Sequence, residues 1–206
     1  MKHAIKHFKL VNLAALSLLM LNAGCSSISG DPVKDAQAAM ASFRYEEARI
    51  HLANAVKEDP GNALAHFLNG QVALAMGNSD LAKTELAPLL KHPDFGKRAR
   101  PLLAKAYLVG GTPQEALNVL AAGGNLNAVG SAVAVASLQA LGKAEEANAK
   151  LNEALAAYPE SLDLGLLEGA RAMGAGDAAS ATAIADRLIK AAPGNPEALI
   201  FAGRVA

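Results

Sequence analysis

The sequence contains one cysteine and no tryptophan, and aromatic residues make up only 4% of its 206 positions. A single thiol excludes an intramolecular disulfide framework and any metal site that needs several cysteines. The chain also has no excess of positive charge for binding nucleic acid, because 19 acidic residues balance its 19 lysines and arginines. Alanine and leucine are abundant instead, which favours closely packed helices. We therefore expect an all-α protein.

The N-terminal residues are typical of an export signal. Lysines lie among the first nine residues, and an apolar run follows over residues 10–21. This run is too short to cross a bilayer, which takes about 20 apolar residues in a helix. We expect residues 1–24 to be a signal peptide that is removed, which places Cys25 directly after the cleavage site.

Residues 21–25, Leu-Asn-Ala-Gly-Cys, resemble the lipobox of bacterial lipoproteins, in which small residues precede a cysteine that is acylated. The resemblance implies that Cys25 is lipidated and that residues 25–30 form a short tether to the membrane. Ser26 is similar to the residue that follows the cysteine in outer-membrane lipoproteins, which implies an outer-membrane anchor and a periplasm-facing protein. The alternative interpretation is an uncleaved or ordinarily cleaved signal with an incidental buried cysteine.

A repeat of about 34 residues runs through the rest of the chain. Glycines at 77, 111, 142 and 176 each precede an alanine by five positions, at places where a helix must end in a left-handed residue. The alanines continue back by one more repeat, with spacings of 34, 34, 31 and 34 residues: Ala48, Ala82, Ala116, Ala147 and Ala181. Each unit is predicted to be a helical hairpin with small residues where its two helices cross.

These positions resemble the tetratricopeptide repeat (TPR) family, whose units also carry a glycine and a tyrosine in the first helix and a proline after the second. Beyond the central alanines, the matching residues are Gly70, Gly169, Gly203, Tyr107, Ala55, Ala154, Pro60, Pro159 and Pro193. The resemblance implies a right-handed α-solenoid of antiparallel hairpins over residues 31–206, with eleven helices. The expected repeats are 29–62, 63–96, 97–127, 128–161 and 162–195, with a sixth beginning at Pro196.

Three local features depart from or refine this pattern. The third repeat lacks three residues near 121–125, so we expect its second helix to be short. Pro88 lies inside a predicted second helix and is expected to kink it. The run from Thr112 to Glu115 has the sequence of a capping box, with Pro113 at the first helical position.

The sequence has no pattern that indicates catalysis or metal binding. It lacks HExxH and G-x-S-x-G motifs, its one cysteine lies in the lipobox-like segment, and its glycine pairs follow predicted helices rather than strands. We expect His66 to be a half-buried packing residue. The chain is therefore predicted not to be an enzyme and to need no metal or cofactor.

In the TPR family, first-helix positions 5, 9 and 12 of each repeat line a concave surface that binds proteins or peptides. Transferred to this chain, they are Val33, Gln37, Met40, Phe67, Gln71, Leu74, Pro101, Lys105, Leu108, Ala132, Ala136, Gln139, Leu166, Ala170 and Met173. The set is mostly apolar and holds one cation. It therefore favours an apolar helix or extended peptide over the acidic C-termini that lysine-rich family members bind. We expect protein or peptide partners, and no small-molecule substrate.

Together, these features predict a lipid-anchored scaffold for protein–protein interactions in the bacterial cell envelope. The order of lipobox, short spacer and repeats is similar to the TPR lipoproteins of exopolysaccharide export and PEP-CTERM protein sorting. Two alternatives stay open: a pilotin-like lipoprotein of type IV pilus assembly, which the chain resembles in length, and the regulatory arm of an enzyme whose catalytic domain follows Ala206.

Overall fold

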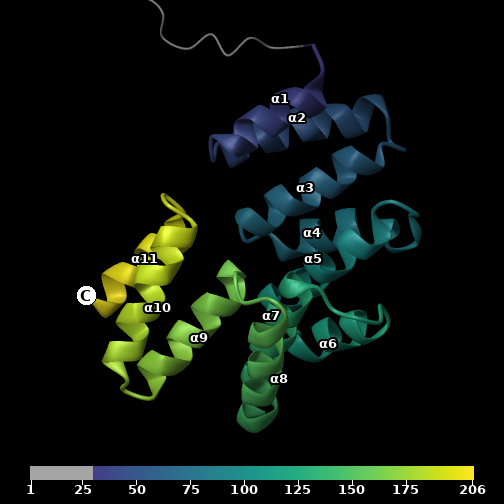
Figure 1. Cartoon of the computed structure of the whole chain (residues 1–206). Helices are drawn as coiled ribbons and strands as arrows, with labels where there is room; N and C mark the ends of the chain where they lie inside the picture. The colour runs from purple at the N-terminus through teal and green to yellow at the C-terminus, as the bar shows by residue number, and fades with distance from the viewer. Residues whose placement is uncertain (1–29) are drawn as a thin grey trace, which may run out of the picture.

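The computed structural model describes residues 30–206, which form eleven α-helices and one 3₁₀ helix, with no strand in this range (Figure 1). The elements are α1 (Pro32–Ala41), α2 (Tyr45–Glu58), α3 (Ala63–Ala75), α4 (Ser79–Leu86), η1 (Pro88–Lys91), α5 (Gly96–Val109), α6 (Pro113–Ala121), α7 (Ala128–Ala140), α8 (Ala144–Ala157), α9 (Leu162–Gly174), α10 (Ala178–Ala191) and α11 (Pro196–Val205). The expected signal peptide, Cys25 and most of the tether lie outside the described residues. Over residues 30–206, no helix has both the length and the apolar character needed to span a bilayer.

Consecutive helices pair as five hairpins, α1 with α2 through to α9 with α10, and α11 packs on the last of them. The first helices α3, α5, α7 and α9 also contact one another in succession, so the hairpins stack into a solenoid. In Figure 1 the array curves from α1 at the top, through α8 at the bottom, to α11 on the left. The predicted all-α solenoid and its eleven helices are confirmed over the described residues.

Small residues allow the two helices of each hairpin to approach closely. The five central alanines, one in each second helix, are at most 1% exposed. A Cβ atom on Gly70 of α3 would lie 2.5 Å from Cγ of Leu86 in α4, within one hairpin. Between neighbouring repeats, one on Gly169 of α9 would lie 2.2 Å from the ring of Phe201 in α11. Any larger side chain at these glycines would force the helices apart.

The turn within each hairpin needs one residue with a left-handed backbone. Gly77, Gly111, Gly142 and Gly176 have φ between 72° and 77°, as expected. In the first hairpin the same position is held by Phe43, which has φ 57° and is 61% exposed. Its ring meets that of Tyr45 edge-on, with centroids 6.3 Å apart. A left-handed conformation costs a residue with a Cβ atom about 1–2 kcal/mol, so this turn is strained where the other four are not.

The second helices of repeats two and three are short, as the proline and the missing residues imply. The kink expected at Pro88 is not found, because Pro88 ends the helix. Helix α4 stops at Leu86 and a 3₁₀ turn follows. Proline lacks an N–H and clashes with the carbonyl four residues earlier, so here the helix does not continue past it. Helix α6 has nine residues, whereas α2, α8 and α10 have 14 each, which confirms the expected short helix.

The capping box expected at Thr112 is not formed. The Thr112 hydroxyl donates instead to the carbonyl of Tyr107, at 2.9 Å, and makes no bond to the first N–H groups of α6. That carbonyl belongs to the last turn of α5 and also accepts the Thr112 N–H at 2.9 Å, so both donors of Thr112 bond to the C-terminal end of α5. Pro113 does occupy the first position of α6, as predicted.

Replacing the strained residue should stabilise the first hairpin. We expect Phe43→Gly to raise the free energy of unfolding by about 1 kcal/mol, because glycine adopts positive φ without a Cβ clash. For a chain of this size, the melting temperature should then rise by about 2–4 °C, which thermal circular dichroism would measure.

Ala38→Gly is the matched control, because Ala38 is exposed in the middle of α1. There the same new residue should cost about 1 kcal/mol. A loss of stability in Phe43→Gly similar to that in Ala38→Gly would contradict the assignment of strain.

Candidate functional site

The inner side of the array is formed by the first helices of successive repeats, and its clearest hollow lies between α5, α7 and α9. This concave hollow has a volume of about 250 Å³. Its lining residues are Lys105, Leu108, Val109, Val129, Ala132, Val133, Ala136, Asp163, Leu166 and Leu167. Eight of the ten are apolar, and the two charged residues have opposite sign. The hollow can therefore accept an apolar side chain.

The hollow brings together five of the residues that the sequence predicted: Lys105, Leu108, Ala132, Ala136 and Leu166. The other five lining residues were missed, and each follows from the same helical geometry. Three of them come directly after a predicted position, and Val129 and Asp163 lie one turn before one. A helix turns by about 100° per residue, so a ligand between three helices contacts the neighbours of each predicted position as well.

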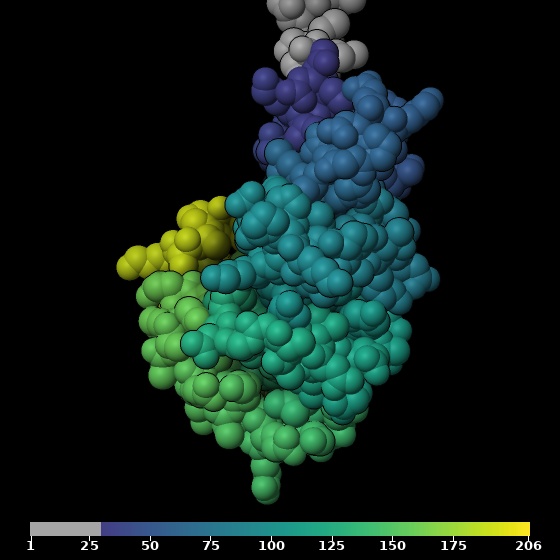
Figure 2. All heavy atoms as spheres, turned by 90° about the vertical axis from the view of Figure 1, so that its right-hand side faces the viewer, coloured from purple at the N-terminus to yellow at the C-terminus, as the bar shows by residue number. Residues whose placement is uncertain are grey.

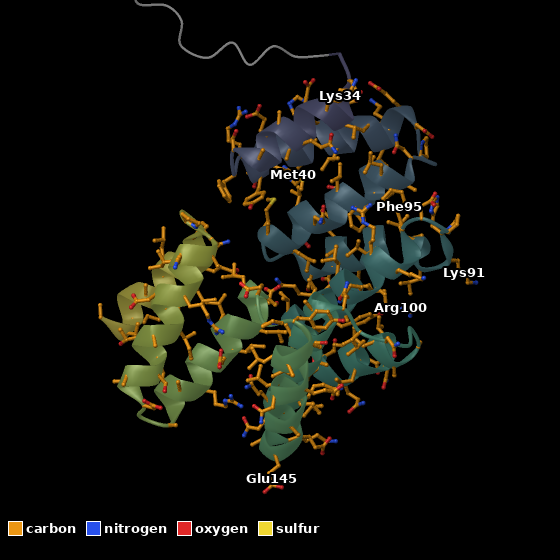
Figure 3. The ribbon with its side chains drawn as sticks, in the orientation of Figure 1. Lys34, Met40, Lys91, Phe95, Arg100 and Glu145 are labelled. Atoms are coloured by element: carbon orange, nitrogen blue, oxygen red, sulfur yellow. The ribbon has the colours of Figure 1, made fainter. Side chains whose placement is uncertain are left out.

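Other predicted positions on the inner side are accessible but lie outside this hollow. Gln37, Gln139 and Ala170 are exposed, and Gln71 is half-buried. Val33 and Met40 pack partly against the core of the first hairpin, and Leu74 packs against that of the second. Figure 3 shows Met40 at the lower edge of the first hairpin. Met173 is 40% exposed and lies against α10 and α11, in a separate hollow.

Phe67 and Pro101 do not belong to the concave surface, which corrects the transferred set. Phe67 is only 3% exposed, because its ring packs 5.3 Å from that of Phe95 and the Arg98 guanidinium lies 4.5 Å from its centroid. Pro101 is buried too, and it lines a different hollow at the start of α5. Both side chains are covered because the first helices of adjacent repeats pack directly against each other.

A polar network joins α3 and α4 beside the second hairpin's core. His66 Nδ1 lies 2.5 Å from a Glu85 carboxylate oxygen, and His66 Nε2 lies 3.0 Å from the carbonyl oxygen of Pro60. Glu85 as a residue is only 9% exposed, and its other carboxylate oxygen accepts a hydrogen bond from buried Asn69 at 3.0 Å. The expected half-buried His66 is thus confirmed, and both of its ring nitrogens face acceptors, which suits the protonated ring.

The surroundings raise the pKa of His66 above its ordinary value of 6.5. Burial alone would lower this pKa, but the hydrogen bonds to the Pro60 carbonyl and to Glu85, with the charges of Glu85 and Asp59, outweigh it. Because the pKa is higher in the folded state, the protonated ring stabilises the fold. This stabilisation is complete below the unfolded-state pKa and is lost as the pH rises through the folded-state pKa.

We therefore expect the free energy of unfolding to fall as the pH rises through the range just above 6.5, and His66→Gln to remove most of this dependence. Urea unfolding at a series of values between about pH 6 and pH 9 would measure it. His92→Gln, which changes a histidine outside the network, is the control and should keep the dependence. An unchanged pH dependence in His66→Gln would contradict the role given to this network.

No group of three or more histidine, cysteine, aspartate or glutamate residues within 30–206 is arranged to hold a metal ion.

Comparison with known proteins agrees with this geometry. The sequence profile of the tetratricopeptide repeat family matches residues 39–105. No curated protein matches the chain. Among solved structures, TTC0263, a TPR protein in Thermus thermophilus, superposes with a TM-score of 0.72 at 19% identity over 85% of this chain and 97% of that one.

Two further structures share the fold. PilW, a type IV pilus biogenesis factor, has a TM-score of 0.62 at 18% identity, over 87% of this chain and 85% of its own. YrrB, a TPR protein with an unusual peptide-binding site, has a TM-score of 0.52 at 19% identity, over 82% of this chain and 89% of its own. Residues 39–105 thus match the profile of the tetratricopeptide repeat family, and the described chain has the fold of TPR proteins.

Proposed function

We propose that the protein is an interaction scaffold whose concave hollow binds an apolar helix or extended segment of a protein partner. The observation that carries this proposal is the hollow between α5, α7 and α9, which presents apolar side chains from three successive repeats on the inner side of the solenoid. Exposed apolar surface of this kind is typical of a recognition groove. The peptide-binding site of YrrB, a protein of the same fold, supports it.

The two charged residues of the hollow give the partner a direction. Lys105 lies on α5 and Asp163 on α9, so a bound segment crosses between a cation and an anion contributed by different repeats. Burying one leucine-sized side chain there stabilises the complex by about 1.5–3 kcal/mol. Contacts with the charges add orientation rather than much affinity.

The proposal places this scaffold in the bacterial envelope, with Cys25 lipidated, residues 1–24 removed and the solenoid held at the periplasmic side of the outer membrane. Residues 21–25 and Ser26 support this location. We favour a role in exopolysaccharide export or PEP-CTERM-type sorting. Pilus assembly is the second candidate, because PilW shares the fold over most of both chains. Polysaccharide genes or pilus genes beside the coding sequence would distinguish the two, and a catalytic domain in the same reading frame would indicate the regulatory arm of an enzyme.

A charge placed inside the hollow should abolish binding. Ala136 lines the hollow on α7 and is half-buried. Peptides selected by phage display on the purified protein should be rich in leucine, isoleucine and phenylalanine. Ala136→Glu should weaken their binding by about tenfold or more in fluorescence titrations, because a carboxylate then faces apolar groups.

Ala149→Glu makes the same substitution at an exposed position of α8 and should bind like the wild type. Selected peptides that bind equally well to all three proteins would show that the hollow is not the peptide site.

Lipidation is tested separately from peptide binding. Cells fed a clickable fatty acid should label the wild-type protein and not Cys25→Ser, because only a thiol at this position accepts the lipid. The labelled protein should fractionate with the outer membrane, since two or more acyl chains anchor a protein stably. Equal labelling of both proteins would refute the lipoprotein proposal, and recovery with the inner membrane would refute the outer-membrane location.

A further inference from the structure

A second hollow lies on the edge of the array, away from the concave surface, between the start of α5 and the start of α7. Its volume is about 500 Å³, twice that of the concave hollow. The two hollows contact different parts of α5: Lys97, Arg100 and Pro101 line this edge hollow, whereas Lys105 and Leu108 line the other. Figure 2 looks onto this edge of the molecule.

The edge hollow exists because two second helices are short. Helix α4 has eight residues and α6 has nine, whereas the other second helices have 14. Pro88 ends α4, and three residues are missing where α6 would continue. The 3₁₀ turn before α5 and the glycine-rich turn after α6 replace the absent helical turns, and residues of both segments line the hollow. Space between packed helices is normally filled, so this opening is a specific feature of the third repeat.

The lining of the edge hollow is basic in a chain that is neutral as a whole. It includes the cations Lys97 and Arg100, and it contains no aspartate or glutamate. From Lys91 to Lys105 the sequence has five lysines and arginines and a single acidic residue, Asp94. Within residues 30–206, neither Lys97 nor Arg100 forms an ion pair. Five cations at or within the second helices do: Arg44, Arg49, Lys83, Lys143 and Lys150. Two cations therefore face this opening without a neutralising partner.

Arg100 is held in place beside the opening. Its Nη1 donates to the carbonyl of Val119 in α6, at 3.1 Å. Gly123 makes room for this position, because a Cβ atom there would lie 2.1 Å from Cδ of Arg100. The bond to Val119 uses one donor of the guanidinium group, and the others stay available for a ligand. Figure 3 shows Arg100 and Lys91 on this same edge.

Backbone dipoles add to the positive potential. The first turns of α5 and α7 both reach the hollow, through Gly96 and Gly130. Asn127 caps α7 with its side chain, whereas α5 has no side-chain cap and the N–H groups of Gly96 and Arg98 donate to backbone carbonyls. The first N–H groups of a helix carry partial positive charge and favour an anion nearby. The N-terminal turns of two helices and two positively charged side chains thus line one cavity.

We propose that this edge hollow is a second binding site that takes a carboxylate side chain from an acidic segment of a protein partner. The cations account for the carboxylate, since arginine binds it through two parallel hydrogen bonds. The remaining walls account for a peptide rather than an inorganic anion, because Leu90, Pro93, Leu120 and Leu126 offer apolar contact. The edge hollow is a recess, so it also suits a peptide side chain better than a flat membrane surface.

The site is tested with a short capped peptide of alternating glutamate and leucine, added to the full-length protein in detergent. Isothermal titration should give saturable binding that weakens as salt is raised. The amide NMR signals of Lys97, Gly123 and Asn125 should shift on binding. Lys97→Gln and Arg100→Gln should each weaken binding by about tenfold, because each removes a charge-assisted hydrogen bond.

Lys190→Gln is the matched control, because Lys190 is an exposed cation on α10 that forms no ion pair in the described chain. It should bind the peptide like the wild type. Lys97 is exposed, so Lys97→Gln should keep the fold even if Arg100→Gln loses its contact with α6.

Three results would overturn the proposal. The first is equal binding of a peptide with glutamine in place of glutamate. The second is wild-type binding by both Lys97→Gln and Arg100→Gln. Alternatively, inorganic phosphate would shift the same amides at lower concentration than the peptide, which would make this a site for free anions.

Discussion

The close crossing of the two helices in each hairpin is the constraint on which the rest of this structure depends. It requires a small residue at one position of every second helix, and the five alanines there are almost completely buried. Once they are in contact, the larger side chains around them, such as Leu52 and Leu151, become fully buried as well. The stability of such an array is approximately the sum of the stabilities of its hairpins and of the contacts between neighbouring hairpins. The repeating residues therefore serve packing rather than recognition.

The surface available for recognition is therefore found where first helices meet or where the repeat is incomplete. The concave hollow arises from the first situation, since α5, α7 and α9 contact one another in succession and line the hollow together. The edge hollow arises from the second, where Pro88 and the missing residues shorten α4 and α6. Both hollows share α5, a helix of 14 residues that presents one end to each.

The repeat architecture could be predicted from the sequence because its determinants are local and periodic. Glycines 77, 111, 142 and 176 specify four of the turns through their backbone conformation, and the alanines specify the crossings, so the spacing together with the family resemblance predicted eleven helices. Side-chain positions that depend on neighbouring repeats could not be read in this way. Phe67 became buried because Phe95 and Arg98 cover it, and Thr112 bonded to α5 rather than capping α6. In each case a contact between segments decided the outcome.

The same distinction explains what was foreseen of the candidate sites. Five residues of the concave hollow lie at family positions and could be named in advance, whereas the edge hollow has no counterpart in a regular repeat. Its cations are ordinary surface residues in the sequence, and only the shortened helices place Lys97 and Arg100 beside the turn at Gly123. The sequence showed the proline and the missing residues, but not which side chains would line the resulting space. A solenoid can therefore form an individual binding site where its repeat is irregular, because packing between repeats does not determine the residues at those positions.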